Sequence, residues 1–72
     1  MIISSYKNQL GDHASLTVDF NEVHFPVKYV VSSNRGGSKE FPGTEQGARD
    51  ASKHYNALVA EGNRRVIAKC MV

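Results

Sequence analysis

Histidine and cysteine are the residue types in this chain that could bind a metal ion or act as nucleophiles. The sequence contains three histidines, His13, His24 and His54, and one cysteine, Cys70. No two of them have the short spacing, about two to five intervening residues, that joins ligands in common zinc motifs. We therefore expect three surface histidines, no metal site and no cofactor.

Covalent or acid–base catalysis needs a second group that activates the reacting one. Cys70 has no electropositive helix start next to it in the sequence, so we interpret it as a small core residue. The acidic residues are scattered, and the G-x-S-x-G motif of serine hydrolases does not occur. We therefore expect that the protein is not an enzyme.

The basic residues suggest a different chemistry, the binding of a phosphate backbone or of an acidic protein groove. Segment 35–39, Arg-Gly-Gly-Ser-Lys, has two glycines between cations, so its backbone N–H groups could approach an anion. This segment matches neither the P-loop motif nor the dinucleotide-binding motif. The alternative to anion binding is that the segment is a hairpin tip whose glycines adopt positive φ. Further basic residues follow between residues 49 and 69. They form either a solvated face or one continuous basic edge.

Length and composition limit the architecture that positions these residues. The chain has 72 residues, a net charge of +2 and 40% hydrophobic residues, which fits one domain over residues 1–72 with a small core. No apolar segment approaches the ~20 residues of a membrane span, and residues 1–7 do not resemble a signal peptide. A single cysteine cannot form an internal disulfide, so we expect a cytoplasmic location.

Two runs of alternating apolar and polar residues, 14–20 and 23–31, predict the two central strands. A two-residue turn at 21–22 would place Val18 opposite Phe25 on the apolar face of a hairpin. Phe25 is therefore expected in the core.

The flanking segments predict further strands and turns. Residues 2–7 are a strand candidate, and residues 39–41 predict a short strand that returns along the second central strand. Glycine-containing turns at 11–13 and 33–38 separate them from the central pair.

One helix is predicted over residues 45–61, with Thr44 as its N-cap and Leu58 on its apolar face. Gly62 is typical of a helix end, and alternation over residues 64–72 predicts a closing strand.

Together these elements predict an α+β protein. We expect an antiparallel sheet of three to five strands with one α-helix packed on one face, in the order β-β-β-(β)-α-β. The uncovered face of this sheet is expected to carry Thr17, Asp19, His24, Lys28, Val30, Ile67 and Met71.

The order of elements from Phe25 to Lys69 resembles small phage-encoded host-takeover inhibitors of the RNA polymerase inhibitor and anti-CRISPR types. Those proteins have a short antiparallel sheet, one helix and a closing strand, and the helix entry at 44–48, Thr-Glu-Gln-Gly-Ala, is similar to theirs. The resemblance implies a non-catalytic protein that blocks a larger machine in the host cytoplasm. It implies no individual binding residue, because these families share no common motif.

A second resemblance is to DNA-binding domains of the integrase-arm and plant ethylene-response type. It is carried by the strand at 39–41, by Thr44 and by the spacing of Ala48, Ala51 and Tyr55. It implies that the sheet reads DNA. The chain differs from those domains in two ways. A strand is expected after the helix, and the expected sheet lacks a dense set of Arg and Trp.

We therefore expect a small non-enzymatic interaction protein, encoded by a phage or mobile element, that binds and inhibits or modulates a host protein or nucleoprotein complex. The alternative is a small DNA-binding domain that uses a basic loop and edge, and a homodimer that covers the open face is a third hypothesis. Cations would steer association and a tyrosine would anchor it. The expected partner-binding residues are Arg35, Lys39, Arg49, Lys53, Arg64, Arg65, Lys69, Tyr6 and Tyr29.

Overall fold

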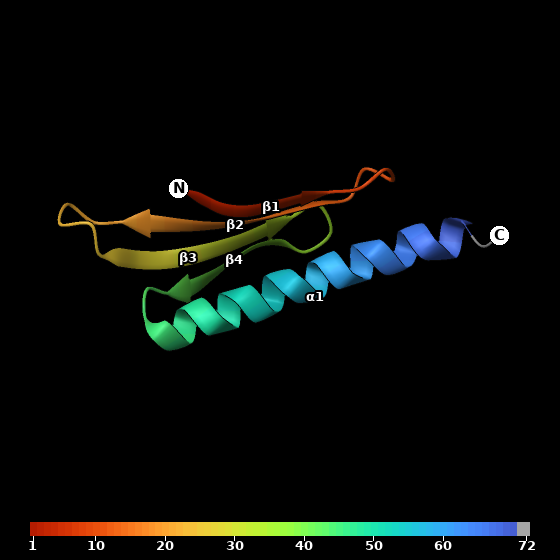
Figure 1. Cartoon of the computed structure of the whole chain (residues 1–72). Helices are drawn as coiled ribbons and strands as arrows, with labels where there is room; N and C mark the ends of the chain where they lie inside the picture. The colour runs from red at the N-terminus through yellow and green to blue at the C-terminus, as the bar shows by residue number, and fades with distance from the viewer. Residues whose placement is uncertain (71–72) are drawn as a thin grey trace.

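The computed structural model describes residues 1–70 as a four-stranded sheet with one long helix on one of its faces (Figure 1). The strands are β1 (Ile2–Lys7), β2 (His13–Phe20), β3 (Pro26–Ser33) and β4 (Gly37–Pro42), and the helix α1 is Glu45–Cys70. Each strand pairs antiparallel with the next, in the order β1-β2-β3-β4. The predicted α+β class, with a helix packed on an antiparallel sheet, is confirmed.

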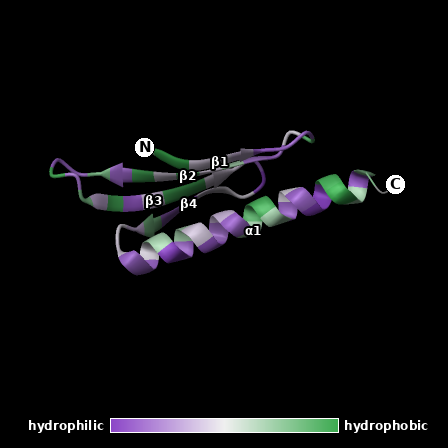
Figure 2. Cartoon of the chain, in the orientation of Figure 1, coloured by the Kyte–Doolittle hydropathy of each residue, from purple (hydrophilic) through white to green (hydrophobic). Residues whose placement is uncertain are grey.

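The core lies between α1 and the inner face of the sheet. Along β2, every second residue from Ala14 to Val18 is buried, as the period-2 pattern of the sequence requires. Figure 2 shows the corresponding alternation of hydrophobic and hydrophilic residues along the strands. Leu58 is half-buried and packs against this core, as predicted. The buried apolar residues of β2, β3 and α1 are Ala14, Leu16, Val18, Val31, Ala51 and Tyr55.

The start of α1 follows the capping signal in the sequence. The hydroxyl oxygen of Thr44 accepts a hydrogen bond from the backbone N–H of Gly47 at 3.0 Å, so Thr44 is the predicted N-cap. Gly47 is buried against the end of β4. A Cβ atom at this position would lie 1.8 Å from the carbonyl oxygen of Pro42. Only glycine therefore allows the helix to lie this close to the strand.

The register of the β2–β3 hairpin differs from the predicted one. The loop spans residues 21–25 in place of a two-residue turn at 21–22, and Val18 pairs with Tyr29 where Phe25 was expected. The shift of partner, from 25 to 29, is an even number of residues. The apolar residues therefore stay on the inner face although the pairing changes.

The side chain of Asn21 explains the wider loop. Its Oδ1 atom accepts hydrogen bonds from the backbone N–H groups of Val23 and Phe25, both at 3.0 Å. His24, between them, has a φ of 64°, in the left-handed region. The loop leaves Phe25 67% exposed, so its predicted place in the core is wrong.

The helix continues to Cys70, so the closing strand predicted over 64–72 is wrong up to that residue, and residues 71–72 lie outside the described part of the chain. Gly62 is inside the helix and buried. A Cβ atom there would lie 2.9 Å from both Cε2 and Oη of Tyr6, so the glycine permits close packing and does not end the helix. Cys70 lies in the last turn and is exposed, which corrects its interpretation as a core residue.

The outer face of the sheet is polar. The Lys28 ammonium lies 2.5 Å from Glu40 and 3.9 Å from Asp19, and the contact with Glu40 is the main cause that raises the pKa of Lys28. Of the residues predicted for this face, it carries Thr17, Asp19, Lys28 and Val30, whereas His24 lies in the β2–β3 loop, Ile67 lies in α1 and Met71 is outside the described residues.

Candidate interaction surfaces

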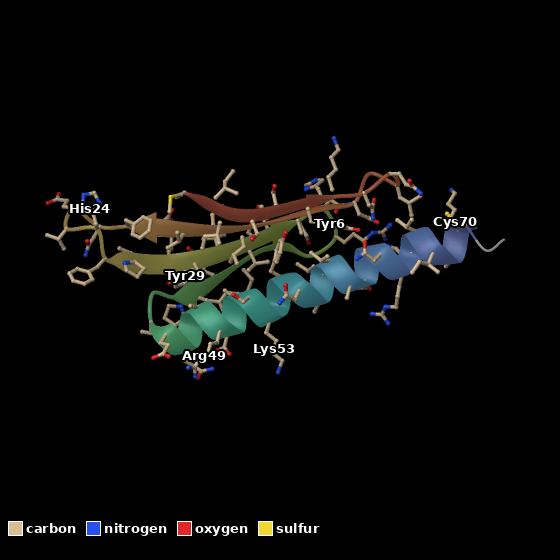
Figure 3. All side chains as sticks on the ribbon, in the orientation of Figure 1. Tyr6, His24, Tyr29, Arg49, Lys53 and Cys70 are labelled. Carbon is tan, nitrogen blue, oxygen red and sulfur yellow. The ribbon has the colours of Figure 1, made fainter. Side chains whose placement is uncertain are left out.

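The elongated molecule, 51 Å long and 19 by 16 Å across, has two chemically different ends. The Asp12 end contains the β1–β2 turn, the β3–β4 turn and the C-terminal half of α1. The apolar end contains the N-terminus, the β2–β3 loop and the start of α1. Figure 3 shows Tyr6 and Cys70 toward the first end and His24 at the tip of the second.

A buried carboxylate organises the Asp12 end. The residue Asp12 is 4% exposed, and each of its two oxygens accepts two hydrogen bonds. Oδ1 accepts from Nε of Arg35 at 2.8 Å and from the amide of Asn34 at 3.3 Å. Oδ2 accepts from Nε of Arg65 at 3.0 Å and from the amide of Asn8 at 3.2 Å. A buried charge of this kind is stable only because its hydrogen-bonding capacity is filled.

The same contacts set the charge state of the cluster and fasten α1 to the sheet. The hydrogen bond from Arg35, and after it the one from Arg65, hold the pKa of the Asp12 carboxyl well below its usual range. In return, Asp12 raises the pKa of Arg35. Tyr6 adds a further link, because its hydroxyl donates to the side-chain oxygen of Asn63 at 2.8 Å. Both turns and the helix are therefore held by one carboxylate.

A pocket of about 200 Å³ opens beside this cluster. Leu58, Ala14 and the ring of Tyr6 form its apolar part. The rest of the wall is polar and charged, and it consists of Asp12, His13, Ser33, Asn34, Arg35, Gly36, Glu61 and Arg65.

The structure brings three of the predicted partner-binding residues together at this pocket, namely Tyr6, Arg35 and Arg65. Asp12, the common partner of the two arginines, was not predicted as a site residue. Its two arginines are 23 and 53 residues away in the sequence, so no local pattern could identify it. The only local signal is an acidic residue placed directly before an apolar strand.

Two further predicted cations border a shallow hollow between β4 and α1. The ammonium of Lys39 lies 5.4 Å from the centre of the Phe41 ring, which in turn lies 5.8 Å from the ring of His54. Lys53 lines the same hollow from the helix, as does Asp50. The acidic side chain limits the positive charge that this hollow presents.

The remaining predicted residues do not join either group. Arg49 is exposed and forms an ion pair with Glu45 one turn earlier in α1, at 2.7 Å. Arg64 and Lys69 are exposed on the second half of α1. Tyr29 is half-buried and packs against the core.

The apolar end is the surface that the sequence analysis missed. Seven large apolar side chains gather there, each between 44% and 73% exposed. Of the nine large apolar side chains that are exposed in residues 1–70, these seven lie at this one end. The alternating pattern of four of them, Phe20, Val23, Phe25 and Val27, predicted core strands. The end of the hairpin extends beyond the helix that would cover it (Figure 1). The residues are Met1, Ile2, Ile3, Phe20, Val23, Phe25 and Val27.

Backbone contacts place the segments that carry these side chains next to one another. The N–H of Val18 donates to the carbonyl oxygen of Met1 at 2.9 Å, which places the N-terminus beside the end of β2. Across the next pair of strands, Phe20 is opposite Pro26. The N–H of Gly43 donates to the carbonyl oxygen of Val27 at 3.0 Å and closes the other side.

Within residues 1–70, no three His, Cys, Asp or Glu side chains are placed together as metal ligands. In the same residues, α1 lacks the apolar stretch that a helix needs to cross a bilayer. Comparison of the chain with protein-family models, with curated proteins and with solved structures gave no match. The fold itself therefore defines the class: an α+β protein made of a four-stranded antiparallel meander and a C-terminal helix.

Proposed function

We propose that the chain is a small non-enzymatic interaction protein that binds a partner protein through its apolar end. The observation that carries the proposal is the set of seven exposed apolar side chains at that end. Soluble monomers rarely expose a contiguous apolar patch larger than about 300–600 Å², and larger patches are characteristic of interaction sites. Inhibition of a host complex, expected from the resemblance to phage proteins, is the corresponding biological role.

The β2–β3 loop has the features of an interface centre. Phe25 and Val23 are 67% and 66% exposed, and the hydrogen bonds from their backbone to Asn21 fix the loop that presents them. A rigid, exposed aromatic side chain loses little conformational entropy on binding and is a frequent binding hot spot. Polar neighbours, Glu22 and His24, would form the rim.

The test compares exposed apolar side chains at two sites, the β2–β3 loop and α1. The double variant Val23→Ser, Phe25→Ser removes the loop anchors, and the control Ile67→Ser removes a similarly exposed side chain, 57% exposed, from α1. Tagged proteins are used to capture partners from nuclease-treated host lysate. We expect one stoichiometric partner that the wild type and Ile67→Ser retain and that the double variant loses.

Two results would contradict the proposal. One is equal capture by all three proteins. The other is a dimer, in sedimentation of the purified protein, that the double variant converts to a monomer, because the apolar end would then bind a second copy of the chain.

A second candidate function, nucleic-acid binding, rests on the solvent face of α1. Arg49, Lys53 and Arg64 lie within about 60° of one another around a helix with 100° per residue. All three are exposed. If this row contacts duplex DNA, log K should fall with log salt at a slope of about −0.9 per phosphate, and Lys53→Glu should reduce the slope. Absence of duplex binding at low salt would exclude this function.

A further inference from the structure

Two guanidinium groups at the Asp12 end have Nη atoms that make no hydrogen bond within residues 1–70. In the hydrogen bonds within residues 1–70, Arg35 and Arg65 donate to Asp12 only through Nε. Each guanidinium keeps four further N–H donors, on its two Nη atoms. An additional protein contact of these atoms is an ion pair at 3.5 Å between Nη1 of Arg65 and Glu61.

Asp12 holds both guanidinium groups in position. Because its four hydrogen bonds come from two arginines and two asparagines, the carboxylate acts as a fixed anchor at the inner side of each arginine. The side chains of Arg35 and Arg65 are 60% and 27% exposed, so their outer parts remain accessible. Donors fixed before the ligand arrives bind at a smaller entropic cost than mobile ones.

Both arginines line the pocket described above, and its size limits the ligand. Its volume of about 200 Å³ is smaller than the ~300–1,000 Å³ of typical small-molecule sites. It therefore has room for one charged group and a short apolar stem, not for a whole nucleotide cofactor. Leu58 and the ring of Tyr6 provide apolar surface for the stem.

The charges around the pocket nearly cancel. Asp12 and Glu61 oppose Arg35 and Arg65. Binding would therefore depend on directed N–H donors and not on a strong overall field. Glu61, whose side chain is 58% exposed, competes with a ligand for Nη1 of Arg65.

We propose that this pocket is an oxyanion site, which binds a phosphate monoester or a carboxylate through the Nη donors of Arg35 and Arg65. Planar guanidinium groups match the paired oxygens of both anions. The site lies at the opposite end of the molecule from the apolar end and does not depend on the function proposed for it.

The experiment is a titration of the isotope-labelled protein, followed by NMR at the backbone amides and at the arginine Nε–H groups. Inorganic phosphate, phenyl phosphate, acetate and benzoate are added at constant ionic strength, with chloride as the reference anion. We expect saturable shifts at Gly36 and at both Nε–H groups, and the order of affinities distinguishes a phosphate site from a carboxylate site. Phenyl phosphate and benzoate, which carry an aromatic ring, test the apolar part of the pocket.

Matched variants separate the site from a general salt effect. Arg35→Gln should weaken binding about tenfold or more, because it removes charge-assisted hydrogen bonds. Arg49→Gln removes the same charge from α1, away from the pocket, and should leave the affinity unchanged. Glu61→Gln should strengthen binding several-fold, since it removes the competing carboxylate.

Several results would overturn the proposal. They are the absence of saturable shifts with all four anions, equal shifts with chloride, and equal weakening by Arg35→Gln and Arg49→Gln. If Arg35→Gln does not fold, Glu61→Gln decides, because unchanged or weaker binding in that variant contradicts the site.

Discussion

Replacement of Gly47 by alanine tests the close contact between α1 and β4. Alanine is the better helix former by about 1 kcal/mol, so helix propensity alone would make Gly47→Ala more stable than the wild type. The structure opposes this gain, because the new Cβ would lie 1.8 Å from the carbonyl oxygen of Pro42. Real Cβ contacts are longer than 3.0 Å, and the obstacle is backbone, which no side-chain rotation can relieve.

The start of α1 must therefore move away from the sheet and carry buried Ala51 with it. Overpacking of this kind costs about 1–3 kcal/mol, and a clash with backbone places it at the upper end. After the gain in helix propensity, the net loss is about 2 kcal/mol, a fall in Tm of roughly 8–16 °C for a domain of this size.

Thermal unfolding followed by circular dichroism measures the effect. Ser52→Ala is the control, because it improves helix propensity by at most about 0.5 kcal/mol at an exposed position of the same helix. We expect it to raise Tm slightly. If Gly47→Ala melts at or above the wild-type temperature, the close approach of α1 to Pro42 is refuted.

Three further predictions concern other parts of the molecule. The pKa of Asp12 is lower in the folded protein than the ~3.9 of an unfolded chain, so its stabilising effect is complete above about pH 5 and is lost as pH falls below 4. Melts between acidic and neutral pH should show a shallower acid loss for Asp12→Asn, and an unchanged pH profile would contradict this. Phe25→Ala should change the free energy of unfolding by no more than about 0.5 kcal/mol, whereas Leu16→Ala should lower it by about 2–5 kcal/mol. Urea unfolding measures both free energies. A large loss of stability in Phe25→Ala would mean that Phe25 is buried in the core. Cys70 is exposed, so in the folded protein it should react with a thiol reagent as fast as in urea, and protection by folding would count against the described end of α1.

The strands were predictable because their signal is local. Alternation along β2 identifies the inward-facing residues without knowledge of any partner, and Thr44 marks the start of α1 for the same reason. The β2–β3 register was not predictable in this way. It depends on hydrogen bonds from the backbone of Val23 and Phe25 to one side chain, Asn21, which outweigh the preference for a shorter turn.

The end of α1 and the candidate sites depend on contacts between distant parts of the chain. Glycine commonly ends a helix, so Gly62 was interpreted as the end of α1. Only the position of the Tyr6 ring shows why a glycine is needed inside the helix. Continuation of the helix brings Arg65 to Asp12, a contact that a closing strand would not have made. An error at one glycine therefore concealed the contact between the helix and the Asp12 end.

The length of the molecule makes its two ends thermodynamically independent. The apolar end and the Asp12 end lie at opposite poles of a body 51 Å long, far beyond the 7–10 Å within which substitutions usually couple. Effects of changes at Phe25 and at Arg35 on stability should therefore add, and a double-mutant cycle should give a coupling energy near zero. Two ligands bound at the two poles would not touch, so one chain can hold both at once. In such an assembly the protein would act as a rigid spacer. The lengths of its strands and helix would set the distance between the two bound ligands.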